Sequence, residues 1–215
     1  MGLWKEMLDL LFPPRCAFCR KILKKGESGV CAACVGDLPY AEGEQKVEFV
    51  ECCVAPLFYR DKVRDALLRY KFDGVTAYSG VFGHLVAECI RDRLAGRYDL
   101  ISWVPLSGAR LKQRGYDQAM LIAMAAALEL DDVAVETLRK TADVAPQSQT
   151  GSVEKRRANI SGAYEPADRE LVQGKRILLI DDIVTTGATF AECARTLGLA
   201  GAESVVCCAV ARVVD

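Results

Sequence analysis

The chain has 215 residues, of which 51% are apolar and 27% charged, so it can bury a core and is not of disordered composition. Its 28 lysines and arginines nearly balance its 29 aspartates and glutamates, which argues against binding of polyanions over the whole surface but allows local basic patches. No apolar run approaches the roughly 18–20 residues of a membrane span, and the charged N-terminal segment lacks a small-residue cleavage site. We therefore expect a cytoplasmic protein with no membrane insertion.

Ten cysteines are the unusual feature of the composition, and four of them are crowded near the N-terminus. Cys16 and Cys19 form one C-x-x-C pair, and Cys31 and Cys34 form a second pair after a short spacer. Two such pairs can surround one cation tetrahedrally, as in closed structural zinc sites. The alternatives are a redox dithiol or two disulfides, but a redox pair would not come in duplicate. The spacing predicts a small ribbon folded around one structural Zn²⁺ per chain.

The other six cysteines have apolar neighbours and lack the spacing of metal ligands. They are Cys52, Cys53, Cys89, Cys193, Cys207 and Cys208. Free cysteine is among the most buried residue types, so we interpret these residues as part of the core. For the adjacent Cys52 and Cys53, the alternative is the remnant of a second metal-binding knuckle.

After a polar connector over residues 42–46, segments with helix and strand patterns alternate. Helices are predicted over 61–71, 79–95, 119–130 and 188–199, and strands over 100–104, 133–138, 177–180 and 204–211. This alternation predicts an α/β fold, with a parallel sheet flanked by helices and ligands bound beyond the carboxyl ends of the strands. The polar segment 139–163 has neither pattern and is a candidate lid. We expect an N-terminal helix and zinc ribbon over 1–50 and an α/β domain over 51–215.

The sharpest motif covers residues 177–189, with the sequence ILLIDDIVTTGAT. An apolar strand leads to Asp181 and Asp182, and a turn rich in hydroxyl groups then opens into a helix. The N–H groups at a helix N-terminus can bind a phosphate, and the carboxylates just upstream can accept hydrogen bonds from sugar hydroxyls. The spacing matches neither a Walker loop nor a G-x-G-x-x-G dinucleotide turn. It predicts a site for a phosphorylated pentose; the alternative is an acid pair that merely precedes a capped helix.

This motif resembles the phosphoribosyl pyrophosphate (PRPP) signature of type I phosphoribosyltransferases. Other segments are similar to the ComF family, a competence-associated group that joins a zinc ribbon to a phosphoribosyltransferase domain. These segments are LLFPPRC, the two C-x-x-C pairs, Tyr70-Lys71-Phe72, Val104-Pro105-Leu106 and the stretch from Arg110 to Tyr116. The resemblance implies a type I phosphoribosyltransferase-like sheet preceded by a zinc ribbon. The chain departs from the family pattern at Asp117, where asparagine is usual.

The resemblance also implies roles for individual residues. Asp181 and Asp182 would hold the ribose hydroxyls, directly or through Mg²⁺ bound with PRPP. Thr185, Thr186, Gly187, Ala188 and Thr189 would surround the 5′-phosphate. Arg110, Arg114 and Arg156 would act in catalysis by neutralising the departing pyrophosphate, with the turn from Pro105 to Arg110 as the pyrophosphate loop. A solvated basic face is the alternative interpretation of these arginines.

Two functions remain open at this point. The first is an enzyme that transfers phosphoribosyl from PRPP and releases pyrophosphate, with an acceptor that the sequence does not identify. The second is a non-catalytic module that senses a phosphoribosyl compound or nucleotide and binds single-stranded DNA or competence proteins through its ribbon, where Lys21, Lys24 and Lys25 are clustered. Tyr70-Lys71-Phe72 would either stack on a base or pack between a helix and a loop.

Overall fold

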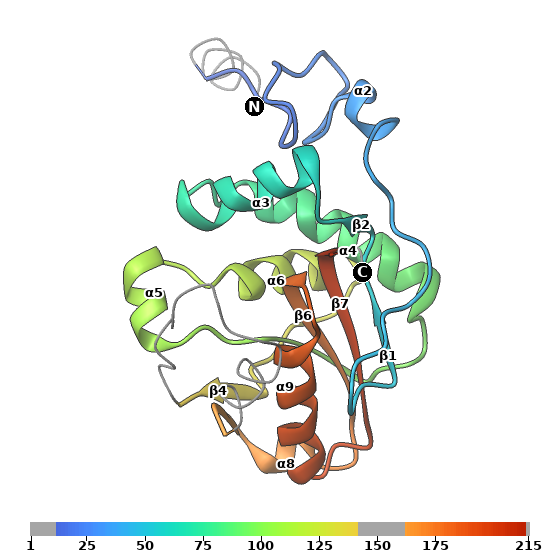
Figure 1. The fold of residues 1–215 in the computed structure, drawn as a ribbon, viewed down its shortest axis with the longest axis vertical. Helices are drawn as coiled ribbons and strands as arrows, with labels where there is room; N and C mark the ends of the chain where they lie inside the picture. The colour runs from blue at the N-terminus through green and yellow to red at the C-terminus, as the bar shows by residue number, and fades with distance from the viewer. Residues whose placement is uncertain (1–11, 142–161, 214–215) are drawn as a thin grey trace.

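A parallel β-sheet lies at the centre of the computed structural model, which describes residues 12–141 and 162–213 (Figure 1). Its strand order is β1-β7-β6-β3, with β2 also paired to β7, and every pairing is parallel. The strands are β1 Cys52–Val54, β2 Leu57–Phe58, β3 Leu100–Trp103, β6 Arg176–Val184 and β7 Ser204–Arg212. The predicted α/β fold with a parallel sheet is confirmed.

Helices cover both faces of this sheet, which explains why its central strands are almost continuously apolar. In β6, Leu178 and Ile180 face α4 Tyr78–Arg93 and α6 Gln118–Glu129, whereas Ile177 and Leu179 face the side of α9. α9 spans Ala188–Leu199, as its pattern predicted. The alternation of side chains along each strand thus fills two separate hydrophobic clusters, one on each face.

Cys52 and Cys53 belong to these clusters. Both are buried in β1, and because consecutive strand residues point to opposite faces, Cys52 packs in one cluster and Cys53 in the other. All ten cysteines are free thiols. The interpretation of this pair as core residues agrees with their placement, and neither lies in the four-cysteine group.

The strand predicted over 133–138 is wrong for most of its length. Ala134 forms only an isolated bridge with Ile101, and Val133 is exposed. Regular pairing begins at Leu138, where β4 Leu138–Lys140 runs antiparallel to β5 Tyr164–Pro166 in a separate sheet. The segment before β4 is attached to β3 by a backbone hydrogen bond from the N–H of Val135 to the carbonyl oxygen of Ile101 at 2.9 Å, and by the hydroxyl groups of Ser102 and Thr137, which lie 2.7 Å apart.

Two further differences concern the region around the predicted site. The residues after Ser107 form a short helix, α5 Gly108–Arg114, so the turn expected to run from Pro105 to Arg110 ends at Ser107. The Ser107 hydroxyl caps this helix by accepting a hydrogen bond from the N–H of Arg110. Strand β6 continues past Ile180 to Val184, so the acid pair lies within the strand.

The cysteine-bearing segment lies at one end of the molecule, against α3 Asp61–Phe72 and α4 (Figure 1). The Phe18 and Phe82 rings meet edge to face, with centroids 6.3 Å apart. The short helix α2 Ala32–Val35 follows Cys31, and α8 Arg169–Val172 precedes β6. The ribbon therefore shares one hydrophobic cluster with the helices of the α/β domain rather than standing apart from it.

Some of the sequence predictions fall on residues outside the described ranges. These are Arg156, most of the candidate lid over 139–163, and the N-terminal helix. Among the helices of residues 12–141 and 162–213, none is long and apolar enough to cross a membrane.

Candidate functional site

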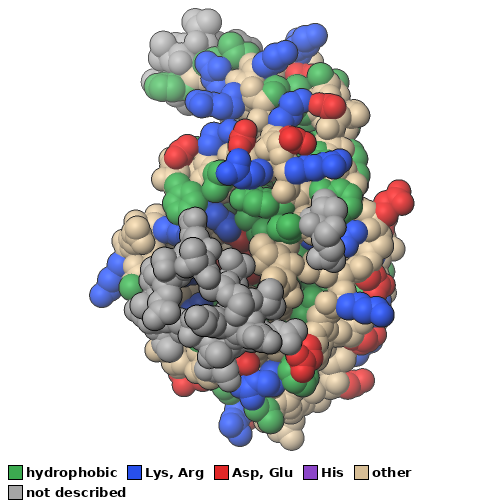
Figure 2. All heavy atoms as spheres, viewed as in Figure 1, with side chains coloured by type: hydrophobic (Ala, Val, Ile, Leu, Met, Phe, Trp, Pro, Cys, Tyr) green, Lys and Arg blue, Asp and Glu red, His purple; other side chains and the backbone are tan. Residues whose placement is uncertain are grey.

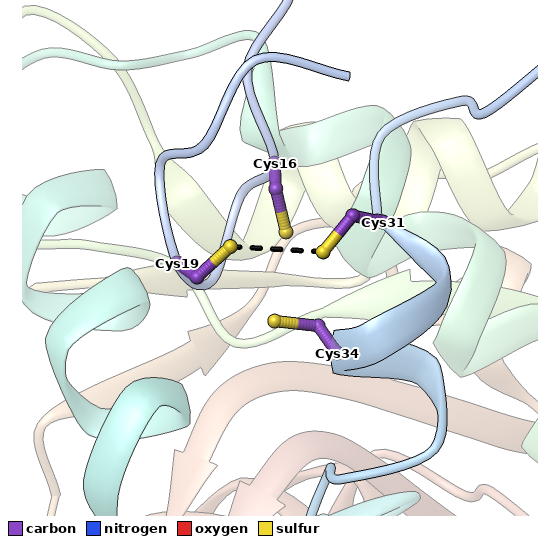
Figure 3. Close-up of side chains that lie close together, drawn as sticks. All are labelled: Cys16, Cys19, Cys31 and Cys34. Carbon is purple, nitrogen blue, oxygen red and sulfur yellow. Dashed lines mark hydrogen bonds between the residues drawn. The ribbon is translucent and has the colours of Figure 1, made fainter. Parts of the chain in front are cut away.

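The four N-terminal cysteines converge on one point, with all four sulfur atoms within 4.8 Å of one another (Figure 3). Cys16, Cys31 and Cys34 are buried, and the sulfur atoms of Cys19 and Cys31 lie 3.6 Å apart. Four thiolates at this separation suit a closed tetrahedral zinc site, which has no open position for water. The cluster is thus a structural zinc site, and it is the one such group of potential ligands within residues 12–141 and 162–213.

The electrostatics of this cluster also favour a bound cation. Burial by itself would raise the pKa of the Cys16 thiol, but backbone N–H groups of Cys19, Cys31 and Phe18 lower it to about 7. Burial and hydrogen bonds with the neighbouring cysteines raise the pKa of Cys34. One ligand is therefore ready to ionise, whereas another needs a positive ion beside it to do so.

The acid pair lies at the carboxyl end of β6, where Asp182 is buried and Asp181 half-buried. An Asp181 carboxylate oxygen accepts the N–H of Asp182 at 2.7 Å. Burial and the charge of Asp182 raise the pKa of Asp181, while Lys71 and this N–H act in the opposite direction. The two acids are consecutive residues of β6, so their side chains project to opposite faces of the sheet. Both carboxylates are poorly solvated, so each favours a positive ion or hydroxyl donors as partners.

The predicted phosphate turn follows directly. Thr185 and Thr186 are exposed, Gly187 is buried with φ +76°, and the helix begins at Ala188 with Thr189 half-buried in its first turn. The N-cap residue of this helix, Gly187, has no side chain, and the N–H of Ala188 donates to the Thr186 hydroxyl at 3.4 Å, so the first N–H groups of the helix face the turn. The geometry suits an anion at the N-terminus of α9.

Glycine is required at position 187 for two reasons. Its left-handed conformation disfavours any residue with a Cβ, and a Cβ built there would lie 2.6 Å from Cγ2 of Val47. Val47 belongs to the segment beyond the polar connector, and the side chain of Gln45 donates to the carbonyl oxygen of Thr185 at 2.6 Å. Residues 45–47 therefore contact the phosphate turn and hold it in position.

The loop after β3 lies at the same edge of the sheet, because β3 and β6 are neighbouring parallel strands and the N–H of Val104 bonds to the Ile180 carbonyl at 3.0 Å. Asp117 holds this loop. One of its carboxylate oxygens accepts the N–H of Leu106 at 2.9 Å, and the other caps α6 through the N–H of Met120 at 3.1 Å. Both carboxylate oxygens of Asp117 therefore accept a backbone N–H. An asparagine could accept only one of these bonds, because its side-chain nitrogen is a donor.

The predicted arginines lie on the helix beyond that loop. Arg110 is exposed on α5, whereas Arg114 is half-buried, donates to Oε1 of Gln118 at 2.7 Å and lies over the ring of Phe72, 5.2 Å from its centroid. Arg114 is thus already partnered by protein groups, while Arg110 is exposed and its charge acts on the hydroxyl of the buried Tyr164. Their role toward pyrophosphate stays a prediction.

Lys71 is a site residue that sequence reasoning did not assign. Its ammonium lies 2.9 Å from Oδ2 of Asp182, in an ion pair between α3 and β6. Gln45, Val47 and Asp117 were likewise not assigned roles in the site. A lone charged or polar residue in a helix or connector has no local signal for such a contact, although Lys71 stands in one of the segments that carry the family resemblance.

Comparison with known protein families finds a matching family for the N-terminal ribbon and another for the α/β domain. A phosphoribosyl transferase domain family matches residues 115–214, and a double zinc ribbon domain family matches residues 7–57. The second family is described as a double zinc ribbon, whereas residues 12–141 and 162–213 contain one four-cysteine group.

Several curated proteins are similar to this chain. Competence protein ComFC of Streptococcus pneumoniae is 31% identical over 147 residues, which cover 68% of this chain and 62% of that protein. Competence protein F of Haemophilus influenzae is 24% identical over 92% of this chain and 96% of its own length. DNA utilization protein YhgH of Escherichia coli is 27% identical over 91% of this chain and 96% of that protein.

Among solved structures, a glutamine PRPP amidotransferase from Bacillus subtilis aligns with 22% sequence identity and a TM-score of 0.43. The alignment covers 62% of this chain and 26% of that protein.

Proposed function

Because this chain belongs to the ComF family, we propose that it binds PRPP at the carboxyl edge of its sheet and transfers the phosphoribosyl group with release of pyrophosphate. The observation that carries this proposal is the strand-turn-helix of β6 and α9. There the acid pair near the end of β6 is followed, after a turn over residues 185–187, by the N-terminus of α9. The carboxylates suit the hydroxyl groups of a ribose 5-phosphate, and the helix N-terminus suits its phosphate group.

Each part of the site has a task in this proposal. Asp181 and Asp182 accept hydrogen bonds from the ribose hydroxyls and so orient the sugar. The turn from Thr185 to Thr189 binds the 5′-phosphate through N–H and hydroxyl groups. The loop held by Asp117 faces the pyrophosphate, with Arg110 and Arg114 on the helix that follows.

The proposed transfer breaks the bond between C1 of the ribose and the pyrophosphate oxygen, which departs with the electron pair, and forms a bond from C1 to a nitrogen nucleophile. Cationic side chains near the departing oxygens stabilise this developing negative charge. The donor set fits Mg²⁺, since carboxylate oxygens are its preferred protein ligands and an ammonium already lies at one of them. When bound, Mg²⁺ would neutralise charge on the pyrophosphate oxygens.

Calorimetric titration with PRPP and Mg²⁺ tests the binding step. Asp181→Asn and Asp182→Asn should each weaken PRPP binding at least tenfold, because an amide loses an acceptor oxygen and the negative charge. Asp99→Asn is the matched control, since Asp99 precedes β3 at the opposite edge of the same sheet and pairs with Arg176. Equal binding by all variants, or no PRPP binding by the native chain, would rule out the proposal.

A screen for pyrophosphate release tests the transfer itself, with nucleobases, ammonia and glutamine as acceptors. Binding of PRPP without release to any acceptor would favour the sensing module over the enzyme. The buried free thiols suit a reducing compartment, so we place the protein in the cytoplasm.

A second function is favoured by the surface of the ribbon. Five cations are exposed there, and Figure 2 shows lysine and arginine side chains gathered over this end of the molecule. They are Arg15, Arg20, Lys21, Lys24 and Lys25. A compact basic surface suits a phosphate backbone, so we propose that the ribbon binds single-stranded DNA or an acidic competence protein.

Binding of single-stranded DNA measured at several salt concentrations tests this function. Replacing Lys21, Lys24 and Lys25 by glutamate should abolish binding, and the native chain should lose affinity steeply as salt rises. Removing zinc with a chelator should also abolish it, because the ribbon presents these cations. Binding that survives the triple replacement would place the DNA contact elsewhere.

A further inference from the structure

The ion pair of Lys71 with Asp182 differs from the other ion pairs of the described residues in its burial. The Lys71 side chain is 18% exposed and that of Asp182 is 10% exposed. In each of the other pairs among residues 12–141 and 162–213, at least one partner is more than a third exposed. A buried pair cannot be replaced by water without leaving a poorly solvated charge behind.

The backbone next to Lys71 is held by hydrogen bonds that involve two tyrosines. The hydroxyl of Tyr70, which is fully buried, donates to the carbonyl oxygen of Gln118 at 3.0 Å, and the hydroxyl of Tyr116 donates to the carbonyl oxygen of Tyr70. These bonds fasten the end of α3 to the beginning of α6. The ammonium is thus delivered to the acid pair by a rigid element on a flexible four-carbon stem.

Charge balance explains why a cation is needed at this point. The charges of Asp182 and Asp117 both raise the pKa of Asp181, and the charge of Asp182 raises the pKa of Asp117. Three poorly solvated carboxyl groups repel one another unless a positive charge lies among them. Lys71 supplies that charge at Oδ2 of Asp182, where a bound cation would also act.

We propose that Lys71 is the resident counter-ion of the acid pair, so that a divalent cation gains access to Asp182 only by displacing the Lys71 ammonium. The inference rests on the proposed PRPP site. It adds a reason why this site would bind free metal ions only weakly. A consequence is that Mg²⁺ binds with the phosphoribosyl ligand rather than before it, because the ligand supplies the further oxygen ligands that offset the loss of the ion pair.

Binding of Mn²⁺ alone, followed by electron paramagnetic resonance without PRPP, tests this inference, since Mn²⁺ takes the same oxygen ligands as Mg²⁺. The native chain should bind Mn²⁺ weakly. Lys71→Met keeps the apolar stem and removes the charge, so it should bind Mn²⁺ at least tenfold more tightly. Lys71→Arg, which keeps the charge, should bind as weakly as the native chain.

Two controls locate the effect. Lys62→Met removes the lysine of an exposed ion pair on the same helix, with Asp37, and should leave Mn²⁺ affinity unchanged. Adding Asp182→Asn to Lys71→Met should remove the gain, because the ion then lacks its ligand. If Lys71→Met does not fold, Lys71→Gln, whose amide can still donate to Asp182, takes its place.

Equal Mn²⁺ affinity in the native chain and in a folded Lys71 variant without charge would overturn the inference. This result is independent of PRPP. If PRPP failed to bind while the Lys71 variants gained Mn²⁺ affinity, the proposed function would be wrong and the counter-ion role would stand.

Discussion

Arg69 donates from Nη2 to the carbonyl oxygen of Ala17 at 2.8 Å, and so holds helix α3 to the backbone of the first cysteine knuckle. The same nitrogen also lies 3.1 Å from the carbonyl oxygen of Phe18. Two residues further along this helix, Lys71 pairs with Asp182. The last turns of α3 therefore contact both the zinc ribbon and the acid pair.

Replacing Arg69 should loosen the ribbon. Arg69→Met removes hydrogen bonds from a charged donor to two carbonyl groups, a loss of about 2–3 kcal/mol in the free energy of unfolding. Chemical denaturation measures this loss. Arg64→Met, on an exposed position of the same helix, is the control and should leave the stability within about 0.5 kcal/mol of the native chain. Equal stability of the two variants would contradict the predicted role of Arg69.

Metal content should follow the four-cysteine cluster. The native chain should contain one zinc ion, and Cys34→Ser should lose it together with the folded ribbon, because a hydroxyl is a poor substitute for a thiolate ligand. Cys89→Ser is the control, since Cys89 is buried on α4 outside the cluster and should leave the zinc content unchanged. Elemental analysis of the purified proteins checks both. Zinc retained by Cys34→Ser would refute the assignment.

Gly187→Ala should damage the phosphate turn. The substituted residue must adopt a positive φ and displace Val47, which together cost about 1–3 kcal/mol and move the N–H groups that face the phosphate. PRPP binding should therefore fall along with stability. Gly198→Ala is a matched control within α9, because nothing lies within 4 Å of its added Cβ and alanine favours a helix. A Gly187→Ala variant with native stability and PRPP affinity would be inconsistent with this geometry.

Asp117→Asn should weaken PRPP binding roughly tenfold with little loss of stability. Asparagine can still cap α6, but its amide nitrogen cannot accept the N–H of Leu106, so the loop after β3 loses its anchor. Asp168→Asn provides the comparison. Asp168 caps α8 through one oxygen, so that exchange should leave both properties near their native values. Calorimetry with PRPP distinguishes the two.

The ion pair of Asp99 and Arg176 should contribute to acid sensitivity. Hydrogen bonds from the side chain and the backbone N–H of Arg176 lower the pKa of Asp99 to about 2. Since the pKa in the folded state is lower than in the unfolded state, about 3.9, the pair stabilises the protein above this range and the contribution disappears as the pH falls toward 2. Asp99→Asn should therefore be less stable than the native chain at pH 6, and the difference should shrink below pH 4. Urea denaturation at several pH values measures it.

The sequence by itself determined those features that are encoded in contiguous residues. The spacing of Cys16, Cys19, Cys31 and Cys34 predicted one cluster because each pair occupies a single turn of chain. The motif over 177–189 predicted the acid pair and the phosphate turn because strand, turn and helix follow one another directly. The central strands were evident because burial on both faces demands a continuous apolar run.

The tertiary structure alone decided which distant residues complete the site. Lys71 reaches Asp182, and Gln45 reaches Thr185, across more than a hundred residues of chain, and neither residue carries a local pattern that would indicate its partner. The segment 133–138 alternates like a strand, yet it joins β3 only through an isolated bridge at Ala134 and the hydroxyl groups of Ser102 and Thr137. The near balance of charges in the composition likewise conceals a basic ribbon and a buried acid pair. Packing of α3 between these two regions is a property of the fold, because it depends on long-range contacts that no stretch of sequence contains.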